Sequence, residues 1–115
     1  FVLGEMPERI RKYDFECRKR NYYWRRLNSA LTKTQTPFIK DYLMATDQDL
    51  EIFGKSAQVV DDNTQPISIS QLGREYHIHD TTMIKKISRV MAELEYLFGP
   101  IPKTVLEEIK EKCNY

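Results

Sequence analysis

Apolar residues recur at helical spacing along much of the chain, and this pattern predicts an all-α protein. Between positions 8 and 31 they recur every three or four residues, at Ile10, Tyr13, Cys17, Trp24, Leu27 and Leu31. This spacing gathers side chains on one side of an α-helix. Arg20 interrupts the apolar stripe, and the opposite side is rich in Lys and Arg. We therefore predict one long basic helix over residues 8–31.

The middle of the chain predicts a second helix followed by a loop. Thr36 and Pro37 form a helix-start signal, because Thr caps free backbone N–H groups and Pro fits the first helical position. Apolar residues follow at Phe38, Ile39, Tyr42 and Leu43. The apolar positions within 50–53 either continue this helix or form a separate turn. Residues 54–66 are rich in Gly, Ser, Asp, Asn and Pro, which is typical of a loop.

Residues 68–98 predict two helices joined by a short turn. Ser68 and Gln71 are spaced as in a capping box, in which each side chain accepts a hydrogen bond from the other residue's backbone N–H. The first helix ends near Tyr76, and the second begins at Asp80 or Thr81. The apolar stripe of the second helix comprises Met83, Ile84, Ile87, Val90, Met91, Leu94 and Leu97. Gly-Pro after residue 98 ends it.

A last helix is predicted over residues 102–113, opened by Pro102 and with Val105, Leu106 and Ile109 facing inward. A length of 115 residues suits one domain. The predicted fold is therefore a single all-α domain over residues 1–115.

The segment 68–98 has the features of a DNA-binding helix-turn-helix. The two helices of such a motif cross closely, so a small residue is needed in the first helix, and Gly73 supplies it. The polar residues left for the exposed face of the second helix are Thr81, Thr82, Lys85, Lys86 and Arg89. Lys and Arg contact phosphates or guanine edges, and Thr reaches a phosphate or a thymine methyl group.

The first helix and the turn also carry a family pattern. Residues 72–76 read hydrophobic, small, Arg-Glu and aromatic, and His77-Ile78 supplies a turn residue and a small aliphatic one. The run from Ser68 to Leu94 resembles the region-four helix-turn-helix of bacterial sigma factors and is similar to the sigma-like regulators of phages of Gram-positive bacteria. The resemblance implies that the second helix enters the major groove of a promoter element.

Three features depart from the family. A glycine is common at the turn, where a positive φ is needed, and this chain has His77. The family usually has Ser or Thr as the cap of the second helix, and this chain has His79 at that position, although Asp80 is an alternative cap. A longer acidic segment separates the motif from the upstream helix. The matching exposed positions are nevertheless polar: Thr81, Thr82 and Lys85 are expected nearest the bases, and Lys86, Arg89 and Arg74 at the backbone.

The charge is distributed unevenly. Residues 1–36 hold nine Lys or Arg against four Asp or Glu, whereas residues 37–66 hold two against six. Surfaces of opposite sign predict different partners. Arg25 and Arg26, beside three aromatic residues, are candidate auxiliary phosphate contacts. We interpret Trp24 as a core residue, with Tyr22 or Tyr23 covering its edge.

The sequence gives little support for a metal site, a catalytic site, a cofactor or a membrane span. Cys17 and Cys113 have no metal-ligand spacing, so reduced thiols or a staple between the chain ends are the interpretations. His77 and His79 have no further ligand nearby, so no metal site is predicted. No catalytic constellation, cofactor loop or apolar run of about 20 residues is present, so neither an enzyme, a bound cofactor nor a membrane span is expected.

The resulting hypothesis is a cytoplasmic, prokaryotic or phage-encoded transcriptional regulator that binds double-stranded DNA. A homodimer would read two half-sites, and RNA polymerase or another protein is a further candidate partner. The alternative is a protein-interaction module, such as a phage-encoded inhibitor or adaptor of a host protein. A subunit of a larger DNA-handling assembly is a third option.

Overall fold

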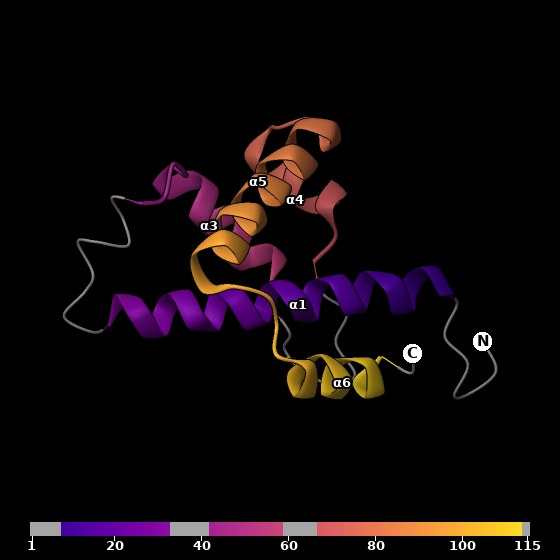
Figure 1. Ribbon diagram of the computed structural model, residues 1–115. Helices are drawn as coiled ribbons and strands as arrows, with labels where there is room; N and C mark the ends of the chain where they lie inside the picture. Colours follow the sequence, from indigo (N-terminus) through magenta and orange to yellow (C-terminus); the bar gives the residue numbers. More distant parts are fainter. Residues whose placement is uncertain (1–7, 33–41, 59–66, 114–115) are drawn as a thin grey trace.

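Five α-helices make up the part of the chain that the computed structural model describes, which is residues 8–32, 42–58 and 67–113 (Figure 1). They are α1 (Glu8–Leu31), α3 (Asp47–Ser56), α4 (Ile69–Tyr76), α5 (Asp80–Phe98) and α6 (Lys103–Lys112). No strand occurs in these ranges, so the all-α prediction is confirmed. The helix start predicted at Thr36 and Pro37 lies outside the described residues. None of the described helices combines the length and apolar content that crossing a membrane requires.

The long helix α1 lies between two groups of helices (Figure 1). On one side, α3, α4 and α5 pack pairwise on one another, and α3 and α5 also contact α1. On the other side lies α6, whose only helical neighbour in the described ranges is α1. The chain therefore forms a three-helix unit that stands on α1, with α6 attached to the opposite face.

The main core fills the space where α1 meets the three-helix unit. Its buried side chains are Tyr23, Leu27, Leu43, Ile52, Phe53, Ala57, Leu72, Met83, Ile87, Val90 and Leu94. Burial of each large apolar side chain contributes about 1.5–3 kcal/mol relative to leaving it in water. Tyr23 is 2% exposed, and its hydroxyl donates a hydrogen bond to the Gly99 carbonyl oxygen at 2.7 Å.

The interpretation of Trp24 as the buried aromatic of α1 is wrong, because Tyr23 occupies the core and Trp24 is only half-buried. The Trp24 ring lies 6.2 Å from the Phe53 ring, centroid to centroid. It also covers Gly54, where an added Cβ would lie 2.5 Å from the indole ring. Gly54 is thus needed inside a helix so that α1 and α3 can approach closely.

The loop predicted over residues 54–66 begins too early, because α3 continues through Ser56. The helix starts with a full capping box: Thr46 Oγ1 accepts the Asp49 N–H and the Asp49 carboxylate accepts the Thr46 N–H, each at 3.2 Å. The apolar positions 50–53 therefore belong to a helix of their own. Residues 59–66 of the predicted loop lie outside the described ranges.

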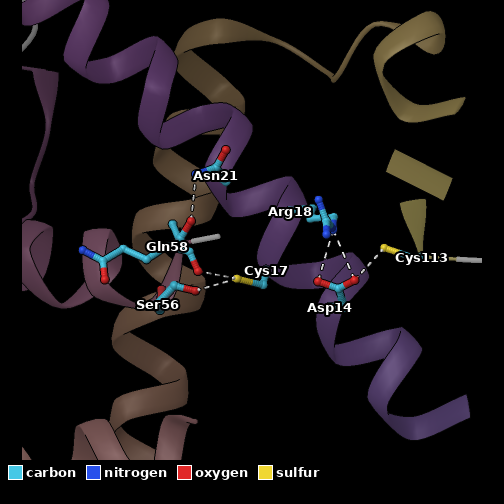
Figure 2. A network of polar contacts seen from close by, with 8 residues as sticks. Asp14, Cys17, Arg18, Asn21, Ser56, Gln58 and Cys113 are labelled. Carbon is cyan, nitrogen blue, oxygen red and sulfur yellow. Dashed lines mark hydrogen bonds and ion pairs between the residues drawn. The ribbon is translucent and has the colours of Figure 1, made fainter. Parts of the chain in front are cut away.

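Polar side chains of α1 bind the end of α3. The Arg20 guanidinium, which breaks the apolar stripe, is buried and donates two hydrogen bonds to the Ser56 carbonyl oxygen at 3.3 Å. Cys17 donates to the same oxygen, and Asn21 donates to the Ala57 carbonyl oxygen at 2.9 Å (Figure 2). These contacts satisfy carbonyl groups that a helix end leaves without partners. They hold α3, and with it the three-helix unit, at a fixed position on α1.

Candidate nucleic-acid interface

The helix α4 begins at a serine cap. Ser68 Oγ accepts a hydrogen bond from the Gln71 N–H at 3.1 Å. Among the described contacts, the reciprocal bond to the Gln71 side chain does not form, so the predicted capping box is only half correct. One capping bond is enough to start this helix of eight residues, whose Leu72 and Gly73 are buried against the rest of the unit.

The turn between α4 and α5 is made by a histidine in the left-handed conformation. His77 has φ 55° and ψ 42°, and its N–H donates to the Arg74 carbonyl oxygen at 3.4 Å. The next residue, Ile78, donates its N–H to the Gly73 carbonyl oxygen at 2.9 Å. The positive φ predicted for this position is confirmed. A non-glycine residue pays about 1 kcal/mol for that conformation.

Gly73 allows the two helices to meet closely. A Cβ at this position would lie 2.7 Å from the Ile78 carbonyl oxygen and 3.0 Å from the Asp80 carboxylate. The first distance excludes a side chain, because the Ile78 carbonyl is a backbone group that cannot move aside cheaply, and at the second distance the Asp80 side chain would have to shift. The prediction that a small residue is needed here is therefore confirmed. Gly73 and the three-residue turn together fix α5 across α4.

The helix α5 is capped by His79 and not by Asp80. His79 Nδ1 accepts a hydrogen bond from the Thr81 N–H at 3.3 Å, and Asp80 is the first helical residue. The Asp80 carboxylate instead accepts a hydrogen bond from Ser70 Oγ at 2.9 Å. This bond joins the first turns of α4 and α5. Asp80 also lies at the positive end of the α5 dipole, where a carboxylate is stabilised.

One side of α5 packs into the core. Met83, Ile87, Val90 and Leu94 are buried, as the apolar stripe predicts. The inclusion of Ile84 in that stripe is wrong, because its side chain is 49% exposed. The residues buried on α5 lie at positions 83, 87, 90 and 94, and a turn of about 100° per residue places Ile84 at the edge of the stripe that they form.

The opposite side of α5 carries the candidate DNA-binding residues. Thr81, Thr82, Lys85 and Arg89 are all exposed, and their spacing places them along one face in the first half of the helix. Arg74 is exposed on α4. Within the described ranges, Arg74, Lys85 and Arg89 have no ion-pair partner. The structure thus places four of the six residues assigned to the motif on one face of α5, and a fifth, Arg74, is exposed on the neighbouring helix α4.

The sixth residue, Lys86, faces α3. Its Nζ lies 3.0 Å from Asp49 Oδ1, and the Lys86 side chain is 32% exposed. Desolvation raises the pKa of the Asp49 carboxyl, but the hydrogen bonds from Lys86 and Thr46 outweigh it and lower that pKa below its ordinary value. The Lys86 ammonium therefore already has an anionic partner within the protein, and it joins α5 to α3.

The acidic residues near this face also have partners. Glu75 lies 3.7 Å from the Lys55 ammonium, and the Asp80 carboxylate is bound by Ser70. From α3, Glu51 accepts a hydrogen bond from the Tyr76 hydroxyl at 2.7 Å. Asp80 keeps its negative charge, because a hydroxyl hydrogen bond does not neutralise a carboxylate. The charged side chains of α4 and the first half of α5 that have neither an ion pair nor a hydrogen bond among the described contacts are Arg74, Lys85 and Arg89, all of them cations. Sequence reasoning missed these contacts, because residues that are 10 to 37 positions apart are joined only by the fold.

Arg25 and Arg26 do not belong to the same surface. The Arg26 guanidinium lies 5.1 Å from the centre of the Phe98 ring, and it donates a hydrogen bond to the Tyr22 hydroxyl at 3.1 Å. Phe98 is the last residue of α5. At 1.5 Å per residue, it lies roughly 25 Å along the helix from Thr81. Arg26 is thus at the end of α5 that lies farthest from the turn, and Arg25 precedes it on α1.

The described residues contain no group of three or more His, Cys, Asp or Glu placed to hold a metal ion. Comparison with known proteins adds no assignment: no family model, no curated protein and no solved structure matches the chain.

Proposed function

We propose that the chain binds double-stranded DNA through α4 and α5, with the first half of α5 in the major groove. Thr81, Thr82 and Lys85 are then nearest the base edges, and Arg74 and Arg89 contact phosphates on either side. A homodimer on two half-sites and a role in transcription fit this activity. Lys86 is assigned to the contact with α3 and not to the DNA.

The observation that supports this function is the set of cations without partners on the exposed face of α5. Lys85 and Arg89 project from a helix whose other face is fully used by the core. Of the nearby carboxylates, Glu75 is paired with Lys55 and Asp80 is hydrogen-bonded to Ser70, so neither pairs with Lys85 or Arg89. The phosphate groups of DNA supply negative charge for these cations. When Lys or Arg neutralises a phosphate, the counterions condensed on the DNA are released, which favours binding. The close crossing at Gly73 fixes the angle at which α5 is presented.

The test is a fluorescence-anisotropy titration of the full chain with mixed-sequence duplex DNA at about 50 mM and about 200 mM salt. We expect affinity to fall by orders of magnitude at the higher salt. The double substitution Lys85→Ala and Arg89→Ala should weaken binding about tenfold or more at the lower salt. It should also reduce the slope of log affinity against log salt by about 1 for each phosphate contact removed.

The matched control is Lys103→Ala with Lys110→Ala, because both residues are exposed on α6 and the double change removes the same charge. This control should bind DNA like the wild-type chain apart from a small general electrostatic effect. Equal losses in the two double variants would mean that binding follows net charge and not the α5 face. Absence of binding in wild type at both salt concentrations would refute the proposed function.

A further inference from the structure

A groove separates α1 from α6 on the side of α1 opposite to the three-helix unit. Its volume is about 420 Å³, which is within the range of about 300–1,000 Å³ that is usual for binding sites. The residues that line this α1–α6 groove are Arg18, Tyr22, Arg25, Arg26, Val105, Glu108, Ile109 and Lys112.

The middle of the α1–α6 groove is apolar. Val105 and Ile109 are one turn apart on α6, and Tyr22 faces them from α1. Tyr22 and Val105 are only half-buried, so the packing of α6 on α1 leaves part of this apolar surface in contact with water. A ligand that covers it gains the free energy of removing apolar area from water.

The edges of the groove are basic. Arg25 lies exposed on α1 and Lys112 lies exposed on α6, and neither has an ion-pair partner within the described ranges. The Arg26 guanidinium rests on the Tyr22 and Phe98 rings, which leaves its charge at the rim. Four of the lining residues are cationic and one, Glu108, is anionic. Arg18 is paired with Asp14 at 3.2 Å, which leaves Arg25, Arg26 and Lys112 as the cations that carry the surplus. The groove thus combines an apolar floor with a surplus of positive charge.

We infer that the α1–α6 groove is a docking site for an amphipathic helical segment of a partner protein, with acidic side chains on one face and apolar side chains on the other. Carboxylates of the segment pair with Arg25 and Lys112, while its apolar side chains cover Tyr22 and Val105. This site is independent of the proposed DNA binding. It also gives Arg25 and Arg26 a role that differs from contact with the DNA held by α5.

The apolar floor favours a peptide over a nucleic acid as the occupant. A duplex presents phosphates and sugars to a basic groove and has no apolar side chain to fill its centre. A single strand offers bases for stacking, but the Tyr22 ring is already covered on one side by Arg26 at 5.9 Å. A peptide with both Glu and Leu side chains matches both parts of the surface.

The location of the groove also allows two partners at once. Arg26 contacts Phe98 at the end of α5, whereas Thr81 and Lys85 lie in its first two turns. A bound peptide would therefore leave the α4–α5 face open. Simultaneous binding of DNA and an acidic segment is a consequence of this arrangement.

The experiment is an anisotropy titration of the full chain against a fluorescein-labelled peptide of about three helical turns with Glu on one face and Leu on the other. We expect saturable binding with a Kd below about 1 mM. A peptide of the same length with Lys in place of Glu should bind about tenfold more weakly or worse, because its ammonium groups are repelled by the cations at the rim of the groove. The substitutions Arg25→Glu and Lys112→Glu together should weaken binding of the acidic peptide by about tenfold or more.

The matched control is Lys103→Glu with Lys110→Glu, which reverses two exposed charges of α6 outside the groove and should leave the peptide affinity within about twofold. Duplex DNA binding by Lys112→Glu should differ from that of wild type only by a small general electrostatic effect, so a failure of peptide binding and a failure of DNA binding are distinguished. No binding of the acidic peptide, equal binding of the Lys peptide, or displacement of the peptide by a single-stranded oligonucleotide would each overturn the inference. The last result would make the groove a nucleic-acid site.

Discussion

At the scale of single residues, His77 in the turn between α4 and α5 is a position where a substitution is expected to stabilise the protein. His77 has φ 55°, a conformation that glycine adopts without strain. We expect His77→Gly to raise the free energy of unfolding by about 0.5–1 kcal/mol, because relief of strain exceeds the greater entropy of glycine in the unfolded chain. Urea denaturation followed by circular dichroism measures this difference.

The control for this prediction is His77→Ala, which removes the same imidazole but keeps a Cβ in the left-handed conformation. It should leave stability unchanged or lower it, so only His77→Gly is expected to raise the free energy of unfolding. A loss of stability in His77→Gly would mean that the imidazole makes contacts that outweigh the backbone strain.

Residue-scale features divide into those that local chemistry sets and those that the fold sets. The need for a small residue at Gly73 and a positive φ at His77 could be predicted, because a tight turn imposes both on its own few residues. The burial of Arg20 and the exchange of roles between Tyr23 and Trp24 could not. Both depend on where α3 lies, and the apolar spacing of α1 contains no information about that position.

At the scale of elements, Asp49 links the start of α3 to the middle of α5. Its carboxylate completes the capping box with Thr46 and pairs with Lys86 at 3.0 Å. We expect Asp49→Asn to lower the free energy of unfolding at pH 7 by about 1 kcal/mol, because a neutral amide weakens both interactions. Urea denaturation at a series of pH values from 7 to 3 tests the prediction.

The pH dependence has a defined sign. The pKa of Asp49 is lowered in the folded protein, so its stabilising effect is present above the ordinary pKa of about 4 and is lost as the pH falls through the folded value. The difference between wild type and Asp49→Asn should therefore be complete at pH 7 and shrink below about pH 4. In a Lys86→Gln background the difference at pH 7 should be smaller, since only the cap remains. A difference independent of pH would assign the effect to the amide itself and not to the charge.

Among the elements, the helices of the motif could be predicted closely, but α3 could not. Residues 68–98 contain a serine cap, a turn and a long apolar stripe, and each of these is a local signal. The start of α3 has Thr46 followed by Asp49 instead of the more usual Glu or Gln, and its interior contains Gly54. Gly54 reads as a loop residue until the Trp24 ring that requires it is placed beside it.

At the scale of the whole molecule, the two sides of α1 differ in how firmly they are packed. The three-helix unit shares one continuous core with Tyr23 and Leu27 of α1. Ile109 of α6 and Cys113, which follows the helix, are buried outside that core. Because elements with few buried contacts open at lower free energy than the core, α6 is expected to detach from α1 before the rest unfolds.

The two cysteines report on this order of unfolding. Burial raises the pKa of Cys113 to about 12, and the Asp14 carboxylate, 3.4 Å from its sulfur, adds to the effect (Figure 2). Burial also raises the pKa of Cys17, whose thiol donates to the Ser56 carbonyl at the end of α3. Because the thiolate is the reactive form, both residues should react very slowly with iodoacetamide at pH 8 in the native protein.

Low concentrations of urea should separate the two thiols. We expect Cys113 to be alkylated about tenfold faster than Cys17 below the transition that Trp24 fluorescence reports, because release of α6 exposes Cys113 and leaves α3 on α1. Mass spectrometry of proteolytic peptides assigns each modification. In the variant Ile109→Ala, which removes apolar contact between α6 and α1 only, the rate at Cys113 should rise further while the rate at Cys17 stays constant. Equal rates at both cysteines would instead make α6 part of one cooperative unit, and the α1–α6 groove would then persist for as long as the core does.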